Sequence, residues 1–183
     1  MDFPLVVLGL GSNLGDSRAI VLDAIKALHD VLLELRAASL YVTEPLYVTR
    51  QASFINTAVA GFYPESSAQS PSTGGEPQPL RASAEGSARN LLRRINEIEA
   101  RFGRDRPREQ RWGERKLDID ILLFGSLTLS ESGLEIPHPR LKERRFALEP
   151  LLELLPEAVD HSTGISYREI CDSLPDQGVR KWE

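Results

Sequence analysis

The sequence predicts an α+β fold: a ferredoxin-like βαββαβ antiparallel sheet with additional C-terminal helices, arranged in three layers (αβα). Four segments have the apolar or alternating patterns of strands: residues 5–10, 38–43, 53–62 and 117–124. Two segments have helical patterns: residues 17–36 and 88–102. Their order along the chain is strand, helix, strand, strand, helix, strand, which is the order of a split βαβ sheet.

The N-terminal half supplies the first three strands and the first helix. The apolar run LVVLGL is followed by the turn GSNLGDS, in which Asp16 is a good helix N-cap. Apolar residues then recur at helical spacing over residues 17–36. ASLYVT at 38–43 is typical of a strand, and Pro45 ends it because proline cannot donate to a ladder. SFINTAVAGF at 53–62 predicts the third strand.

The C-terminal half supplies the second helix, the last strand and the additional helices. The helix at 88–102 has an apolar stripe and is followed by Gly103, a good C-cap residue. LDIDILLF at 117–124 predicts the fourth strand. A third helix is expected near 147–155, and a last short helix begins at Ser166, where S-Y-R-E matches the capping box.

Length and composition indicate one cytoplasmic domain over residues 1–183. Residues 64–88 are rich in Pro, Ser, Gly and Ala, so a flexible low-complexity insertion is expected at about 64–86. Cys171 is the single cysteine, so no internal disulfide can form. The start of the chain lacks a basic signal-peptide region, and no stretch has transmembrane length. The formal net charge of −5 argues against binding to nucleic acid. We also expect a monomer that does not bind membranes.

Asp118 and Asp120 interrupt the apolar run of the fourth strand. Side chains at i and i+2 share a strand face, so the two carboxylates point the same way, whereas Leu117, Ile119, Ile121 and Leu123 are expected on the core face. Two converging carboxylates suit Mg²⁺, which takes oxygen ligands and retains phosphate and water in its shell. A half-solvated polar strand face is the alternative interpretation.

The segment from Arg101 to Lys116 precedes these aspartates and contains seven basic and three acidic residues. Guanidinium groups bind phosphate oxygens in pairs, and metal ions neutralise the remaining oxygens. The segment therefore favours a polyphosphate substrate, although a solvated charged loop would have the same composition. No Walker-type phosphate loop is present in the sequence.

Phe54 and Asn56 form a second constellation because strand alternation places them on one face. Trp112 and Phe146 are candidates to join them, since two aromatic rings can sandwich a flat heterocycle while an amide reads its polar edge. Taken alone, the two phenylalanines are more typical of core residues than of a ligand pocket. His138 lies between two prolines, which fix its local backbone.

Motifs along nearly the whole chain resemble one known family, the 6-hydroxymethyl-7,8-dihydropterin pyrophosphokinases of folate biosynthesis. The matching segments are LGLGSNLGD (8–16), YVTEPLY (41–47), QASFIN (51–56), FGR (102–104), RWGERKLDIDILLFG (111–125) and IPHPRLKERRFALEPLLELLP (136–156). The resemblance implies a transferase that moves pyrophosphate from ATP to the hydroxymethyl group of the pterin and releases AMP. Tyr47 stands where the family commonly has glycine.

The resemblance also implies roles for individual residues. Asp118 and Asp120 would hold two Mg²⁺ ions and, with Arg104 and Arg115, form the catalytic set. The implied ATP contacts are Glu99, Arg104, Arg106, Trp112, Arg115, Ile121, His138 and Arg144. The implied pterin pocket is Thr43, Glu44, Leu46, Phe54, Asn56, Trp112 and Phe146. Arg108 or Arg111 could take the place of Arg106, because the length of this loop varies in the family.

Two other functions fit part of the pattern. Paired strand aspartates also serve Mg²⁺-dependent nucleotidyltransferases, which would release pyrophosphate in place of AMP. A ferredoxin-like nucleic-acid-binding module could use the arginines of 101–116, but it needs exposed sheet aromatics and a basic surface. The negative net charge and the two carboxylates on the sheet argue against that module.

Overall fold

The computed structural model describes residues 3–44, 52–64, 80–104 and 113–183. Its elements, in chain order, are β1 (Leu5–Ser12), α1 (Ser17–Leu28), β2 (Leu33–Ala37), β3 (Tyr41–Thr43), β4 (Phe54–Phe62), α2 (Leu80–Arg101), β5 (Asp118–Phe124), β6 (Leu129–Glu131), β7 (Leu134–Ile136), the 3-10 turn η2 (Leu141–Glu143), α3 (Arg145–Leu154), α4 (Tyr167–Ser173) and β8 (Arg180–Lys181). None of the helices in these ranges combines the length and apolar character that a membrane span needs.

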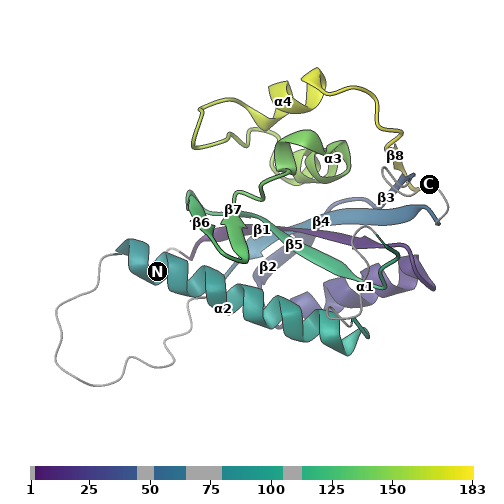
Figure 1. Ribbon diagram of the computed structural model, residues 1–183, viewed down its shortest axis with the longest axis horizontal. Helices are drawn as coiled ribbons and strands as arrows, with labels where there is room; N and C mark the ends of the chain where they lie inside the picture. Colours follow the sequence, from purple (N-terminus) through teal and green to yellow (C-terminus); the bar gives the residue numbers. More distant parts are fainter. Residues whose placement is uncertain (1–2, 45–51, 65–79, 105–112) are drawn as a thin grey trace.

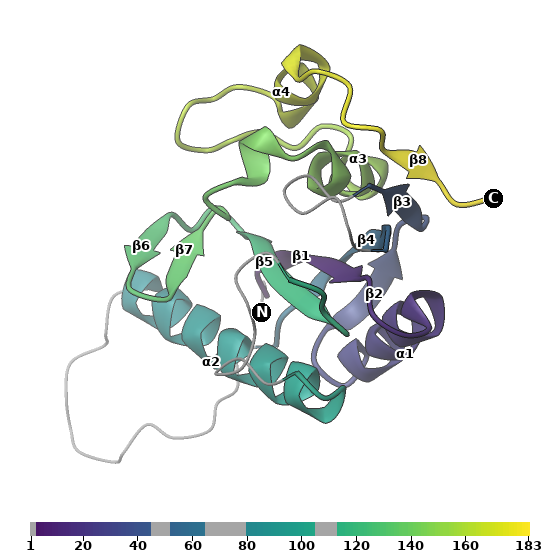
Figure 2. The ribbon, with the colours of Figure 1, turned by 45° about the vertical axis from the view of Figure 1, so that its right-hand side comes forward.

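The main sheet is antiparallel and lies between two helical layers (Figure 1). Its strand order is β5-β1-β4-β3-β8, and β2 also pairs with β4. Helices α1 and α2 cover one face, and α3 and α4 cover the other (Figures 1 and 2). The predicted α+β class with an antiparallel sheet and several helices is confirmed.

A separate hydrophobic cluster fills each side of the sheet. The cluster under α1 and α2 contains inward residues such as Leu8, Val59 and Ile95. The cluster under α3 and α4 contains Ala58 and Leu148. Each strand of the centre therefore buries both faces, which explains why β1 and β4 have almost continuous apolar sequences.

The first helix is shorter than the predicted 17–36. Helix α1 ends at Leu28, and residues Leu33–Ala37 form β2, which pairs with β4. Val31 and Leu32 are buried in the turn between them, and Glu34 has a positive φ of 50°. Apolar spacing continues through this turn, which is why the periodicity suggested one long helix. Asp16 caps α1 as predicted, since its Oδ1 accepts a hydrogen bond from Ala19 N.

The other boundaries differ in a similar way. The predicted strand 38–43 is regular only over β3, and helix α2 begins at Leu80 and not at 88. The C-terminal end of the expected 64–86 insertion is thus helical, because an Ala-rich segment with Ser and one Gly can still form a helix. The β6–β7 hairpin and β8 were not predicted. The capping box at Ser166 is confirmed.

A β-bulge corrects the predicted faces of β5. Val7 pairs with Leu123 and Leu8 pairs with Ile121, which leaves Leu122 as the extra residue. Ile119 and Ile121 lie in the cluster under α1 and α2, as expected. Beyond the bulge the alternation inverts: Phe124 joins that same cluster, whereas Leu123 packs on the α3 side. The predicted placement of Leu123 on the same face as Ile119 and Ile121 was therefore wrong.

Candidate active site on strand β5

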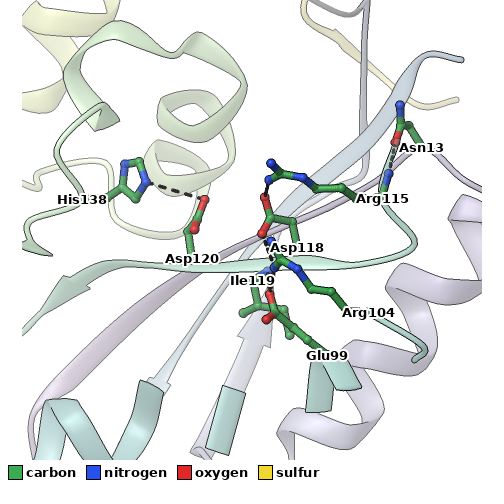
Figure 3. Close-up of polar contacts among 8 residues, drawn as sticks. All are labelled: Asn13, Glu99, Arg104, Arg115, Asp118, Ile119, Asp120 and His138. Carbon is green, nitrogen blue, oxygen red and sulfur yellow. Dashed lines mark hydrogen bonds and ion pairs between the residues drawn. The ribbon is translucent and has the colours of Figure 1, made fainter. Parts of the chain in front are cut away.

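The two aspartates lie on the α3 side of β5, near the strand's beginning (Figure 3). Strand β5 is an edge strand of the described sheet: it stands first in the strand order and pairs with β1. Gly9 and Gly11 of β1 are paired with Asp120 and Asp118. The absence of side chains at these two glycines makes room for Leu122, which would lie 3.3 Å from a Cβ at Gly9, and for Asn56 beside Gly11.

Asp118 is held by two arginines (Figure 3). Arg104 Nη1 donates to Asp118 Oδ1, and Arg115 Nη1 donates to Asp118 Oδ2, each at 2.5 Å. Burial raises the pKa of the Asp118 carboxyl, but the charges and hydrogen bonds of the two arginines overcome it and lower the pKa below its ordinary value. Asp118 is consequently an anion at neutral pH.

Glu99 of α2 anchors both the arginine and the strand. Its side chain is 1% exposed, and its Oε1 accepts hydrogen bonds from Arg104 Nη1 and, at 2.8 Å, from Ile119 N. Arg104 N also donates to the Glu99 carbonyl at 3.0 Å. This buried carboxylate fixes Arg104 against Asp118. Glu99 therefore acts on the site through Arg104 and Ile119.

Asp120 faces His138, the residue between the two prolines. Its Oδ2 is 3.7 Å from His138 Nε2. Burial, and then the nearby charge of Asp118, raises the pKa of Asp120 to about 7. Burial, and then the charge of Arg144, lowers the pKa of His138 to about 4, so the imidazole is neutral at pH 7. Because His138 Nδ1 accepts from Arg140 N at 3.1 Å, the remaining proton lies on Nε2.

Asn13, at the end of β1, fixes the loop that carries Arg115. Arg115 N donates to Asn13 Oδ1 at 2.7 Å, and Asn13 N donates to the Arg115 carbonyl at 3.0 Å. Arg115 Nε is buried and has no hydrogen-bond partner within the described part of the chain. Sequence reasoning treated GSN only as a turn and missed Asn13. The alternating glycines before it were the available signal.

Asn56 and Thr43 form the second half of the site, on the same face of the sheet. Asn56 Nδ2 donates to Thr43 Oγ1 at 2.8 Å, and both residues are almost fully buried. Gly11 pairs with Asn56, and a Cβ at Gly11 would lie 2.9 Å from Asn56 Oδ1. Phe54 is half-buried and pairs with Thr43. The predicted shared face of Phe54 and Asn56 is confirmed.

Arg144 and Phe146 approach the site from the start of α3. The Arg144 guanidinium carbon is 5.5 Å from the centroid of the Phe146 ring, a cation–π contact. The Arg144 charge also acts on Asp120 and His138: it contributes to the lowered pKa of His138 and offsets part of the rise in the pKa of Asp120. The structure therefore brings Arg144 within electrostatic reach of the aspartates.

The remaining predicted site residues divide into two groups. Ile121 packs into the core on the opposite face, so its side chain does not reach the aspartates. Glu44 is exposed just after β3. The others lie outside the described residues: Leu46, Arg106, Arg108, Arg111 and Trp112, as does Tyr47, the departure from the family pattern.

The donor set at the aspartates fits Mg²⁺. No group of three or more His, Cys, Asp or Glu side chains with metal-site geometry occurs among residues 3–44, 52–64, 80–104 and 113–183. Mg²⁺ requires only one or two carboxylates, because substrate phosphates and water complete its shell. The Asp118 charge raises the pKa of Asp120, and a divalent cation between the two carboxylates would remove that cost.

Comparison with protein families gives one match that spans most of the chain. Residues 7–70 and 78–156 match the model of 7,8-dihydro-6-hydroxymethylpterin-pyrophosphokinase (HPPK). The 2-amino-4-hydroxy-6-hydroxymethyldihydropteridine pyrophosphokinase of Bacillus subtilis is 30% identical over 98% of this chain and 90% of its own length. The Methylorubrum extorquens protein of the same name is 34% identical over 96% of this chain and 97% of its own length.

Longer relatives contain a similar segment. The mitochondrial folate synthesis bifunctional protein of Pisum sativum is 34% identical over 88% of this chain, but the chain spans only 27% of its length. Among solved structures, an HPPK-DHPS in complex with substrates has a TM-score of 0.64 at 14% identity, covering 94% of this chain and 43% of that one. The wild-type HPPK-DHPS of Plasmodium falciparum has a TM-score of 0.59 at 14% identity, covering 93% of this chain and 44% of that one. At this identity the structural likeness shows the fold alone.

Proposed function

Because the chain belongs to the 7,8-dihydro-6-hydroxymethylpterin-pyrophosphokinase family, we propose that it transfers pyrophosphate from ATP to the hydroxymethyl group of 6-hydroxymethyl-7,8-dihydropterin in folate biosynthesis. The products are the pterin diphosphate and AMP. The observation that carries the proposal is the pair Asp118 and Asp120 on one edge strand, with two arginines on the first carboxylate. Phosphate-binding and metal-binding groups thus converge on the face that also carries Asn56.

Asp118 and Asp120 are the residues that would hold magnesium. Bound there, two Mg²⁺ ions supply charge neutralisation and alignment of the ATP phosphates. Both carboxylates are fixed by β5, and Asp118 is kept ionised by Arg104 and Arg115. The strand therefore presents the ligands without a rearrangement of the backbone.

The chain's own cations bind the transferred group. Arg115 has a buried Nε donor without a partner among the described residues, so a phosphate oxygen can accept from it. Arg144 adds positive charge from the start of α3. His138, neutral and protonated on Nε2, can donate a hydrogen bond to a phosphate oxygen. Arg106 and Trp112 are proposed ATP contacts from the family resemblance alone.

The pterin would occupy the face formed by Asn56 and Thr43. The Asn56 amide presents one donor and one acceptor, which match the donor–acceptor edge of a pterin. Phe54 and Phe146 are the proposed aromatic walls, and Glu44, Leu46 and Trp112 are proposed to complete the pocket. Gly11 pairs with both Asn56 and Asp118, so a ring bound on this face would lie beside the aspartates.

We also propose that residues 1–183 form a single cytoplasmic pyrophosphokinase domain that acts as a monomer. We propose further that the sheet has the ferredoxin-like topology. It is supported by the order β5-β1-β4-β3, in which β2 and β3 together take the second strand's place beside β4. The two hydrophobic clusters share one sheet, which supports a single folding unit.

The test is to incubate the protein with ATP, Mg²⁺ and the pterin alcohol and to separate AMP from ADP and pyrophosphate. AMP and pterin diphosphate are expected in equal amounts; release of pyrophosphate instead would favour a nucleotidyltransferase. Asp118→Asn and Asp120→Asn should each lower turnover at least ~10³-fold, since an amide is a poor Mg²⁺ ligand. Asp23→Asn, on exposed α1, is the matched control and should not change turnover. Near wild-type turnover of both site variants at millimolar Mg²⁺ would refute the metal site.

A further inference from the structure

The C-terminal segment, residues 174–183, runs from the end of α4 across α3 to the edge of the sheet (Figure 2). It ends in β8, where Lys181 pairs with Tyr41 and Arg180 pairs with Val42 of β3. Trp182 N donates to the Leu40 carbonyl at 2.8 Å. The segment therefore touches both elements that frame the proposed site, α3 and β3.

Gln177, in the middle of this segment, binds the backbone on both sides of Arg144. Its Oε1 accepts from Arg145 N at 2.9 Å, and its Nε2 donates to the Glu143 carbonyl at 2.8 Å. The first amides of a helix have no partner within the helix. The Arg144 side chain makes no capping hydrogen bond, so Gln177 caps α3 from a distance of 32 residues along the chain.

Gln177 is itself held in place from two directions. On one side, Arg145 Nη1 donates to the carbonyls of Cys171 at 3.0 Å and Leu174 at 3.1 Å, which ties the segment to α3. On the other side, Gly178 turns the chain with a φ of 65°, and its N donates to Asp176 Oδ1 at 2.8 Å. β8 then fixes the end of the segment. The amide of Gln177 thus has a defined position.

The fixed residue, Arg144, is one of the site's cations. Its backbone is extended, with φ −124° and ψ 99°, between the turn η2 and α3. Small changes of ψ at this position swing the side chain relative to the Phe146 ring, 5.5 Å away, and relative to the aspartates. Fixing the peptides before and after Arg144 therefore fixes the direction in which its side chain leaves the backbone, and the contact with the Phe146 ring limits where the guanidinium can lie.

We propose that Gln177 is a positioning residue for Arg144, which it directs toward the phosphates of ATP. The inference rests on the proposed function, in which Arg144 contacts ATP. Gln177 itself touches no substrate and acts only through the backbone of residues 143–145. Losing it should weaken ATP use and leave pterin binding by Asn56 unchanged.

The test is a double-mutant cycle of Gln177→Ala and Arg144→Ala. We expect Gln177→Ala to raise KM for MgATP and lower kcat/KM about tenfold, the scale of two lost neutral hydrogen bonds, without changing the pterin Kd. In the Arg144→Ala background the same change should have no further effect. Arg180→Ala, an exposed neighbour in β8, is the control and should behave as wild type. An equal loss in both backgrounds, or no loss in either, would overturn the proposal.

The same cycle is read on the Kd of a non-hydrolysable MgATP analogue by calorimetry, which needs no turnover. If wild-type protein makes no AMP from ATP and the pterin alcohol, the proposed function fails. The calorimetric cycle then still decides whether Gln177 acts through Arg144. If Gln177→Ala does not fold, Gln177→Glu replaces it, because Glu keeps the acceptor for Arg145 N and removes the donor to the Glu143 carbonyl.

Discussion

Replacing Glu99 by Gln tests how the candidate site is supported. The Glu99 carboxylate is 1% exposed, and one of its oxygens accepts from both Arg104 Nη1 and Ile119 N. Gln has the same size and keeps one acceptor oxygen, so the exchange creates no cavity. It removes the charge and places an amide donor near the Arg104 guanidinium, which is itself only a donor.

The expected loss in the free energy of unfolding follows from these contacts. Removing one partner of a buried ion pair costs about 3–5 kcal/mol when the other charge is left alone. Arg104 keeps Asp118 as a partner, and Ile119 N can bond to the Gln oxygen. We therefore expect about 2–4 kcal/mol. For a domain of 150–250 residues each kcal/mol lowers Tm by about 2–4 °C, so a loss near 3 kcal/mol corresponds to about 6–12 °C.

Urea and thermal unfolding of Glu99→Gln measure this loss, and hydrogen exchange at Ile119 N locates it. The amide of Ile119 should exchange faster in the variant, because its acceptor has lost its charge. Glu97→Gln on the same helix is the matched control. Glu97 is half-exposed and, among the described residues, pairs with Arg93, so its substitution should cost no more than ~0.5 kcal/mol. Equal effects of the two substitutions would refute the anchoring role of Glu99.

Two further predictions concern ligand binding and acid stability. Asn56→Ala removes the buried partner of Thr43 and should weaken pterin binding by about 1–3 kcal/mol in calorimetry, with the affinity for a MgATP analogue unchanged; the reverse result would place Asn56 in the nucleotide pocket. Hydrogen bonds from Lys142 and from the loop that follows Asp160 outweigh burial and lower the pKa of Asp160 from its ordinary 3.8. The ionised Asp160 therefore stabilises the fold above about pH 4, and this contribution is lost as the pH falls below that value. Asp160→Asn should accordingly lose less unfolding free energy than wild type between pH 6 and pH 3, and parallel losses in urea titrations would contradict this.

The strand that carries the aspartates was predictable from sequence because its signal is local. Alternation over residues 118–121 requires only the period of a strand, and the structure confirms the shared face of Asp118 and Asp120. The prediction became wrong at Leu123, since the bulge depends on pairing with β1. A register shift of this kind is a property of two strands together, and the sequence of one does not contain it.

The first helix was predicted too long, because local spacing misled the prediction. Val31 and Leu35 continue the apolar spacing of α1, yet the chain turns after Leu28 and starts β2. Residues that are buried in a turn and then in a strand can reproduce helical spacing over a few positions. The contact of β2 with β4, which decides the outcome, joins residues far apart in the chain.

The supporting residues of the site were less predictable than its ligands for the same reason. Asn13, Glu99 and Gln177 each bind the backbone of a segment remote in sequence. A side-chain amide or carboxylate that accepts a hydrogen bond from a distant backbone N–H has no characteristic spacing in the sequence, whereas D-x-D in a strand has one. For Glu99 the family resemblance indicated the residue, but the structure assigns its contacts to Arg104 and Ile119.

The position of β5 at the end of the described sheet explains why the site needs such support. An edge strand has backbone groups that no neighbouring strand satisfies. Here, Ile119 N binds the Glu99 carboxylate, and the carbonyl of Leu122, the bulged residue, accepts from His138 N at 3.0 Å. These two bonds lie on either side of Asp120 in the sequence. The unpaired edge of β5 thereby fixes Glu99, which holds Arg104, and the backbone of His138. The strand that carries the proposed metal ligands therefore also holds the groups proposed to act on phosphate.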